Sequence, residues 1–377
     1  MAALRSALAR LPGNSVTADL PLVDGFAARV DEAGLELLRR EGARVVPDEP
    51  IHLAPEPDSD APHPLLDVSA ATLGLPELWQ RGLTGKGVAI AVLDTGIAPH
   101  PDYNERIVAF YDTVNGREKP YDDRGHGTHV AGICAGSGRA SKGRYKGAAP
   151  EANLVGIKVF DHLGNTDVSH VVRGIQWAVE NKDRLGIKVL NISFGAPAKY
   201  PVKDDPVAQA VEAAVRAGLF VVCASGNSGP WPRTIDTPGT APSALTVGAT
   251  VTYGTPELED DKVAYFSGSG PTYPDGYVKP DVVAPGKGVV STSPDGGYVT
   301  MSGTSMAAPL VAGTAALMYQ LRPDLSPGEM KQLLRATAQR IRSYNENIQG
   351  QGVVQADRAA SRLDPQYPGH PPEGGRP

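Results

Sequence analysis

The sequence of 377 residues predicts an α/β protein, with a mostly parallel, doubly wound sheet flanked by helices and a small α+β domain before it. Two observations predict this class. Near-continuous runs of Val, Ile and Leu of strand length recur along the chain, and helical stretches separate them, which is typical of a parallel sheet covered on both faces. Gly (43) and Pro (34) are spread without a period, which indicates many tight turns rather than a repetitive fold.

The N-terminal segment alternates strand and helix patterns on a small scale. A short amphipathic helix is expected at 2–10, a strand at 21–30, a leucine-rich helix at 31–42 and a returning strand at 43–53. Such a β-α-β unit is too small to bury a large core, so we expect it to be weakly stable by itself.

Composition divides the chain into four parts. Residues 1–55 are the small N-terminal domain, and residues 56–67, rich in Pro and Asp, are a linker. Residues 68–363 are the main domain. Residues 364–377 are predicted to be disordered, because they contain too few apolar groups to offset the entropy lost on ordering.

The main domain supplies the repeated strand and helix signals. Strands are expected at 88–96, 152–160, 187–195, 219–227 and 243–251, and helices at 169–183 and 205–218. In parallel sheets of this kind, ligands bind at the carboxyl ends of the strands, so we expect the functional residues there.

Charge and hydropathy exclude two classes of function. The net charge of −6 argues against a nucleic-acid binder that relies on a basic surface. No run of about 18 apolar residues exists, so we expect no membrane-spanning helix.

The two cysteines and the N-terminus bear on the cellular compartment. Cys134 and Cys223 are too few for a disulfide scaffold, and both lie in apolar segments, so we expect buried free thiols. Arginines interrupt the apolar residues at the start, so no secretory signal is recognised. These features predict a cytoplasmic protein, or a secreted one if the true start lies upstream.

Three residues suggest nucleophilic catalysis. Asp94 ends a buried strand, His126 opens a helix between glycines, and Ser305 precedes an apolar helix. A serine hydroxyl needs a neighbouring imidazole as base, and that imidazole needs a carboxylate to fix its tautomer. Each residue alone is more simply explained as a turn, cap or packing residue. Together, at the edge of one sheet, they form a candidate catalytic triad.

The segments around these residues, VLDTGI, HGTHVAG and GTSMAAP, resemble the three signatures of the subtilisin family of serine proteases. The resemblance implies a subtilisin-like fold and a serine endopeptidase that cleaves polypeptides through an acyl-enzyme. ASGNSG resembles the family's oxyanion-hole segment and assigns that role to Asn227. NISFG and DHLGNTD resemble the strands that pair with substrate, which implies Ser193, Phe194 and Gly195 on one side and Gly164 and Asn165 on the other.

The N-terminal domain resembles the inhibitory propeptide of the same family, although the usual first strand has no clear counterpart in MAALRSALAR. The resemblance implies a self-processing zymogen whose own propeptide is its intramolecular inhibitor. It also implies a monomer, with polypeptides rather than nucleic acid or membrane as partners. Cleavage is expected between about Leu53 and Asp67.

No cofactor is required by this chemistry. Asp102 matches a position that often binds calcium in the family, but the partner loop is rich in Lys and Arg, so we expect that site to be absent and leave other calcium sites open. His126 and His129 form H-x-x-H without the Glu of a zinc motif. A metallohydrolase and a catalytically silent peptide-binding relative are the competing functions.

The sequence predicts the walls of the pocket for the residue before the scissile bond, but not which side chain that pocket prefers. By resemblance its walls are 224–227 and 234–239. Asp236 lies there, and it either favours basic side chains or points away and caps a turn; the turn cap is favoured. The resemblance also implies a cis Thr237–Pro238 bond.

Overall fold

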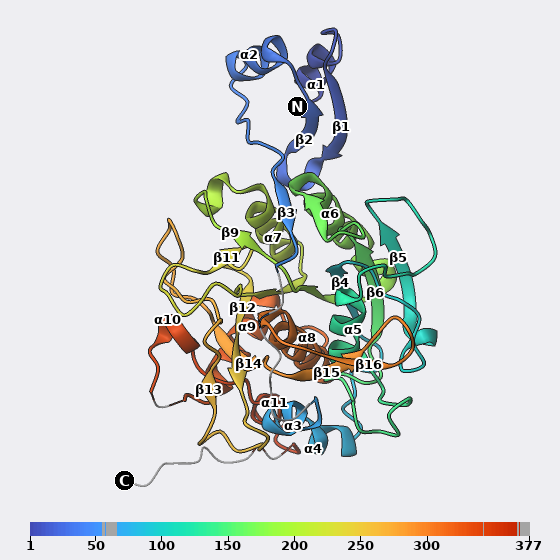
Figure 1. The fold of residues 1–377 in the computed structure, drawn as a ribbon, viewed down its shortest axis with the longest axis vertical. Helices are drawn as coiled ribbons and strands as arrows, with labels where there is room; N and C mark the ends of the chain where they lie inside the picture. Colours follow the sequence, from blue (N-terminus) through green and yellow to red (C-terminus); the bar gives the residue numbers. More distant parts are fainter. Residues whose placement is uncertain (55–56, 58–65, 342, 368, 370–377) are drawn as a thin grey trace.

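The computed structural model describes residues 1–54, 57, 66–341, 343–367 and 369, and it shows a large body with a small N-terminal domain at one end (Figure 1). Most of the predicted linker and the second half of the predicted C-terminal tail lie outside the described residues. The last two residues of the predicted linker, Leu66 and Asp67, already belong to helix α3 (Leu66–Thr72).

The body is built on an eight-stranded sheet, in the order β13-β12-β10-β8-β4-β6-β5, with β14 also paired to β12. All strand pairs are parallel except β12 with β13. The predicted parallel sheet is therefore confirmed. Its strands are β4 (Ala89–Asp94), β5 (Ile107–Asp112), β6 (Asn153–Lys158), β8 (Ile187–Ile192), β10 (Phe220–Ala224), β12 (Leu245–Val251), β13 (Lys262–Val263) and β14 (Val282–Pro285).

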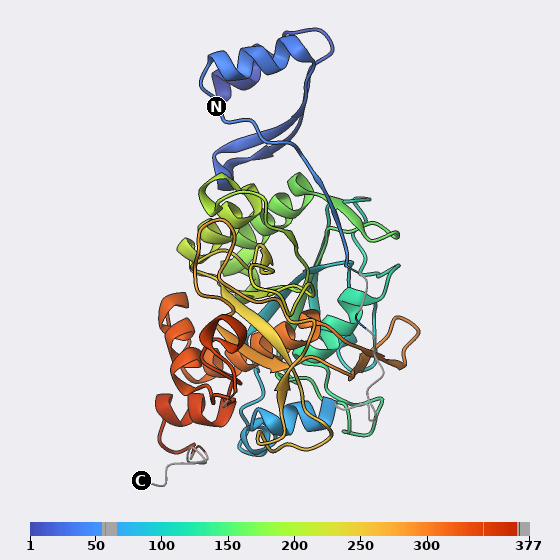
Figure 2. The same cartoon turned by 60° about the vertical axis from the view of Figure 1, so that its left-hand side comes forward.

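Helices cover both faces of this sheet (Figures 1 and 2). Ile90 and Val92 of β4 face one apolar cluster, while Ala91 and Leu93 face the other. This is why the strand is apolar at every position instead of alternating. The first cluster contains α4 (Leu75–Gln80), α5 (His126–Ala135), α8 (Thr304–Leu321), α9 (Pro327–Thr337) and α11 (Ala356–Leu363), together with α3; the second contains α6 (Val168–Leu185) and α7 (Pro206–Arg216).

Short elements complete the body around the edge of the sheet. They are β7 (Asn165–Asp167), β9 (Ala196–Pro197), β11 (Asp236–Thr237), β15 (Val289–Thr292), β16 (Tyr298–Met301) and α10 (Glu346–Gln349). β9 pairs antiparallel with β11, and β15 with β16.

The N-terminal domain differs from the predicted β-α-β unit. It contains α1 (Ala2–Leu8), β1 (Ser15–Leu20), β2 (Gly25–Arg29), α2 (Glu32–Arg40) and β3 (Pro50–His52). β1, which sequence reasoning missed, pairs antiparallel with β2. The strand expected at 43–53 is confined to β3, and β3 pairs with β7 of the body rather than with its own domain.

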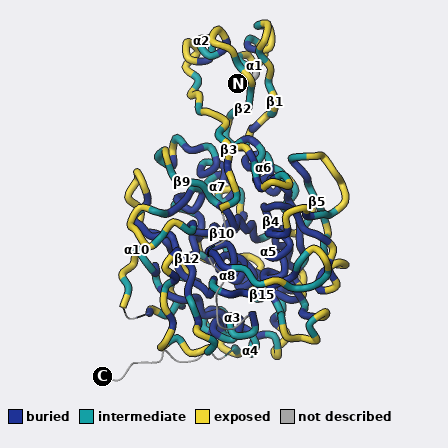
Figure 3. Tube along the Cα trace, viewed as in Figure 1, coloured by how far each residue is buried: buried dark blue, intermediate teal, exposed yellow. Residues whose placement is uncertain are grey.

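This domain packs on α6 and α7 of the body (Figure 2). Leu20 is buried in the apolar cluster of those helices, and the Leu22 N–H donates to Gln176 Oε1 at 3.4 Å. Apart from a few buried positions, its residues are intermediate or exposed, whereas buried residues fill the body (Figure 3). The N-terminal domain therefore depends on the body for much of its apolar burial.

Along the described part of the chain, no helix combines the length and apolar character needed to cross a membrane.

Candidate active site

Asp94 and His126 are joined by a hydrogen bond at the carboxyl edge of the sheet. Asp94 is the last residue of β4 and is fully buried, and its Oδ1 lies 2.8 Å from His126 Nδ1. Oδ1 also accepts the Thr95 N–H at 2.7 Å. Because Nδ1 faces the carboxylate, Nε2 is the imidazole atom left for proton transfer.

A buried aspartate that sequence reasoning missed fixes the turn before His126. Asp122 Oδ1 accepts the N–H groups of Arg124 and Gly125, and Oδ2 accepts the N–H and hydroxyl of Thr128. These bonds satisfy donors at the start of α5 that have no partner within the helix. The helix start, and with it the imidazole, is therefore held on two sides, by Asp122 and by Asp94.

Ser305 lies in the first turn of α8 and is almost buried. Gly303, the residue at the N-cap, has a φ of 151°, a backbone conformation that favours glycine. Asn227, which follows β10 by three residues, accepts the Thr304 N–H at 2.9 Å and the Thr304 hydroxyl at 3.0 Å through Oδ1. Since a backbone N–H can only donate, these bonds identify the amide oxygen and leave Asn227 Nδ2 as a donor beside Ser305.

Helices α5 and α8, which carry His126 and Ser305, pack against each other. α5 starts at the end of β4, and α8 starts beside the end of β10, so both helices begin at the same edge of the sheet. Eight residues further along each helix, Gly313 lies so close to the Cys134 carbonyl that a Cβ on Gly313 would be 2.8 Å from it. The two helices are therefore in direct contact.

The predicted substrate strand at 164–167 is occupied by the chain's own N-terminal domain. β3 pairs antiparallel with β7, and Ile51 lies opposite Thr166. The Leu53 N–H donates to the Gly164 carbonyl at 2.8 Å, and His52 Nδ1 lies 2.7 Å from Asn165 Oδ1.

In the other predicted substrate strand, 193–195, two side chains contact residues outside β3. The Ser193 hydroxyl accepts a hydrogen bond from Asn191, and Phe194 packs edge-on against Phe160. Within the described residues, β3 forms no backbone hydrogen bond with 193–195. Among the described residues, β3 therefore pairs on the β7 side only.

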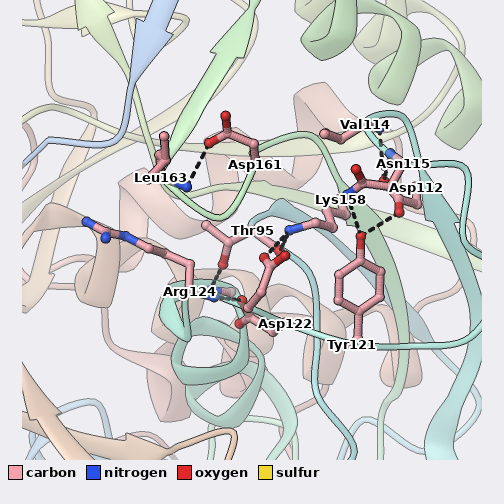
Figure 4. A network of polar contacts seen from close by, with 12 residues as sticks. Thr95, Asp112, Val114, Asn115, Tyr121, Asp122, Arg124, Lys158, Asp161 and Leu163 are labelled. Carbon is pink, nitrogen blue, oxygen red and sulfur yellow. Dashed lines mark hydrogen bonds and ion pairs between the residues drawn. The ribbon is translucent and has the colours of Figure 1, made fainter.

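Lys158 is a buried residue next to Thr95 that sequence reasoning missed (Figure 4). Lys158 ends β6 beside Asp94, and its ammonium donates to the Thr95 carbonyl at 2.6 Å and to Asp123 at 2.7 Å. It also lies 5.0 Å from the centre of the Tyr121 ring. The signal was present as a single lysine within an otherwise apolar strand.

Replacing Lys158 by methionine is expected to lower the free energy of unfolding by about 1–3 kcal/mol, because the Thr95 carbonyl loses a buried donor, whereas the exposed Asp123 carboxylate is hydrated instead. Urea unfolding in a Ser305→Ala background, which prevents self-digestion, measures this change. Lys188→Met is the control, since that ammonium donates to the exposed Pro323 carbonyl and lies 5.9 Å from the centre of the Tyr319 ring, without a buried acceptor among the described residues. Equal urea midpoints for the two variants would show that the ammonium contributes nothing to stability.

His129 Nε2 and the Asp102 carboxylate are both hydrogen-bonded to other groups of the protein. His129 Nε2 lies 3.1 Å from the Val299 carbonyl, and burial lowers the pKa of this imidazole to about 3. Asp102 accepts hydrogen bonds from the Tyr298 hydroxyl and from the N–H groups of Gly138 and Ala140. No group of three or more potential metal-ligating side chains occurs among the described residues.

Two smaller expectations have clear outcomes. The Thr237–Pro238 bond is cis, as the resemblance implied, and Cys134 and Cys223 are buried free thiols.

The turn-cap interpretation of Asp236 is wrong: within the described residues its carboxylate accepts no N–H, whereas Asp205, a true cap, accepts those of Val207 and Ala208.

Known proteins resemble the chain over most of its length. The subtilase family profile matches residues 85–353. Serine protease AprX of Bacillus subtilis (strain 168) is 43% identical over 316 residues, which is 78% of this chain and 71% of AprX. Subtilisin E of the same organism is 32% identical over 352 residues, covering 92% of this chain and 84% of that protein.

Solved structures agree with these sequence relatives. A structure described as a cold adapted subtilisin-like serine proteinase has a TM-score of 0.58 and 33% identity, over 72% of this chain and 88% of that one. A second, described as a psychrophilic protease, has a TM-score of 0.65 and 32% identity, over 72% and 92%. The family profile, the relatives and the shared fold lead to one conclusion: the chain belongs to the subtilase family of subtilisin-type serine peptidases.

Proposed function

We propose that the chain is a serine endopeptidase that acts through Asp94, His126 and Ser305 and is made as a self-processing zymogen. The observation that carries this proposal is the 2.8 Å contact between Asp94 and the imidazole of His126, which opens helix α5, together with the packing of α5 against α8, the helix that carries Ser305 in its first turn. Subtilisins are themselves a type case of this mechanism.

The residues divide the reaction between them. The Ser305 hydroxyl attacks the scissile carbonyl while His126 Nε2 takes its proton, and Asp94 holds the tautomer and stabilises the resulting cation. His126 then gives the proton to the leaving amine, which departs as the acyl-enzyme forms. A water molecule, activated by the same imidazole, releases the second product.

Two donors stabilise the negative charge that develops on the carbonyl oxygen. Asn227 Nδ2 is free to donate because Thr304 fixes the amide through its oxygen. The Ser305 N–H lies in the first turn of α8, where helix N–H groups lack partners and the helix dipole favours an anion.

The N-terminal domain inhibits by pairing as a product would. Backbone pairing of β3 with β7 supplies affinity while alternate side chains fill pockets, which is the usual mode of strand addition. Ion pairs of Glu49 with Lys199 and of Arg44 with Asp204 add to this contact. Once cut from the body, the small domain loses the helices against which it packs, so activation is irreversible.

We expect self-cleavage between about Leu53 and Leu65, since a cut after Leu66 would fall inside α3. Intact mass spectrometry of the incubated chain, with casein hydrolysis followed in parallel, tests this. Wild type should lose the N-terminal domain as activity appears, and Ser305→Ala should stay uncut and inactive. Full activity from an uncut 377-residue chain would refute the zymogen proposal.

Remaining features of the proposal concern metal, compartment and assembly. We infer no calcium at Asp102, because protein donors already fill its carboxylate. The unpaired thiols support a reducing, cytoplasmic compartment. The enzyme is proposed to act on polypeptides as a monomer.

A further inference from the structure

Asp236 is tied to both sides of the predicted substrate site. It begins β11, which pairs with Ala196–Pro197 of β9, directly after Gly195. Its own N–H donates to the Ser225 carbonyl at 3.0 Å, two residues before Asn227. The backbone therefore holds this residue between the segment that binds substrate and the segment that carries the oxyanion donor.

The side chain of Asp236 fills space that two glycines leave open. A Cβ on Gly226 would overlap Asp236 Oδ2, and a Cβ on Gly195 would lie 2.7 Å from the Cβ of Asp236. Both glycines belong to the predicted substrate-binding segments, so the walls here are bare backbone. The carboxylate lies directly against the residue that precedes Asn227.

This carboxylate is buried and has no partner. Asp236 is 9% exposed, and within the described residues its oxygens accept no hydrogen bond and meet no cation. Burial alone raises its pKa to about 7, with no charged neighbour contributing. The other two deeply buried aspartates of the site, Asp94 and Asp122, are both hydrogen-bonded.

A buried carboxyl group without a partner either holds a proton, as its raised pKa indicates, or is stabilised in its charged form by a ligand that brings a cation. We propose that Asp236 forms the floor of the pocket for the residue before the scissile bond and selects arginine or lysine there. This inference rests on the proposed peptidase function. An arginine side chain would bring a charged donor to the carboxylate, whereas a leucine would leave the carboxylate buried and unpaired.

The test compares substrates that differ at one residue. Tetrapeptide p-nitroanilides ending in Arg, Lys, citrulline or Leu are assayed with the processed enzyme. Citrulline has the shape of arginine without its charge. We expect kcat/KM for Arg to exceed that for citrulline by about 100-fold, the scale of a buried charge pair against one unpaired partner. Asp236→Asn should bring this ratio close to one and should leave kcat/KM for the Leu substrate equal or higher, because no carboxylate is then left unpaired beside the leucine.

The pH dependence supplies a second readout. Any ionisation that affects the chemical step affects all substrates alike, so the ratio of Arg to Leu kcat/KM isolates Asp236. As pH rises from 6 to 8, the carboxyl loses its proton and becomes able to pair with a cation, so the ratio should rise. In Asp236→Asn the ratio should be flat. Asp260→Asn, an exposed site on a distant loop, is the control and should behave as wild type.

The outcomes separate the two proposals. Equal hydrolysis of Arg, citrulline and Leu substrates, unaltered in Asp236→Asn, would overturn the role of Asp236 and leave the peptidase intact. Failure to hydrolyse any of the four substrates, together with casein, would instead contradict the proposed function itself. Leu turnover by Asp236→Asn shows that the variant is folded, so the comparison remains decisive.

Discussion

Replacing Ser305, His126 or Asp94 by alanine is expected to abolish nearly all peptide hydrolysis while leaving the body folded. The reason is that proton transfer and nucleophilic attack need all three groups at once. In a subtilisin, a relative for which this has been worked out, loss of the serine or histidine lowers kcat by about 2 × 10⁶-fold and loss of the aspartate by about 3 × 10⁴-fold. Steady-state kinetics on a peptide p-nitroanilide, with circular dichroism to check folding, measures the effect.

Double replacements provide the control for this prediction. Because the three residues act as a unit, Ser305→Ala with His126→Ala should be little worse than Ser305→Ala alone. Additive losses would show that the residues act independently, and near-normal turnover in any single variant would remove that residue from the mechanism. Since Asp94 is fully buried, Asp94→Asn is a useful second variant that keeps its shape.

Replacing Asn227 by alanine is expected to lower kcat by about 10²–10³-fold, a magnitude taken from a subtilisin, with little change in KM. In the proposed mechanism Asn227 Nδ2 donates to charge that exists only in the transition state, while its Oδ1 is held by Thr304. The pH profile should keep its shape, since no titrating group is removed.

The control for Asn227 separates a lost donor from a disturbed loop. Thr304→Val removes the hydroxyl bond to Asn227 but leaves the Thr304 N–H bond, so it should cost much less than Asn227→Ala. A rise in KM with unchanged kcat in Asn227→Ala would mean that Asn227 binds substrate rather than stabilising the oxyanion.

The sequence predicted most strands of the sheet, and it singled out Asp94 and His126, which a hydrogen bond joins in the structure. β4, β6, β8, β10 and β12 were predicted because strands buried on both faces are apolar at nearly every position. β5 was missed because it lies at the sheet edge and is only partly buried. Asp94, His126 and Asn227 could be placed because each stands next to a strong strand, helix or glycine signal.

The polar supports could not be predicted in the same way. Lys158 acts through contacts with Thr95 and Asp123, which are distant from it in the sequence and meet it only after the sheet brings β4 and β6 together. Asp122 instead bonds to residues within six positions of it, and no sequence motif distinguishes such a turn from an ordinary one. The N-terminal domain was mispredicted for a related reason. β3 is a strand because β7 is there to pair with it, and 44–48, which have no backbone hydrogen bond to the body among the described residues, do not continue the strand.

Asp236 is the clearest case of a role that the local sequence alone does not predict. An aspartate among turn residues is usually a cap, and only the position of Gly195 and Gly226 around it shows that it caps nothing. Its local sequence favours one role, and the tertiary contacts favour another.

The most direct test of the central claim is to label the nucleophile. The processed enzyme is incubated with a fluorophosphonate, its intact mass is measured, and the modified peptide is identified as casein hydrolysis is followed. The account predicts one adduct per chain on Ser305, loss of activity in proportion to labelling, and no labelling of His126→Ala. Full hydrolysis by a chain labelled at Ser305, or inactivation with Ser305 unmodified, would contradict it.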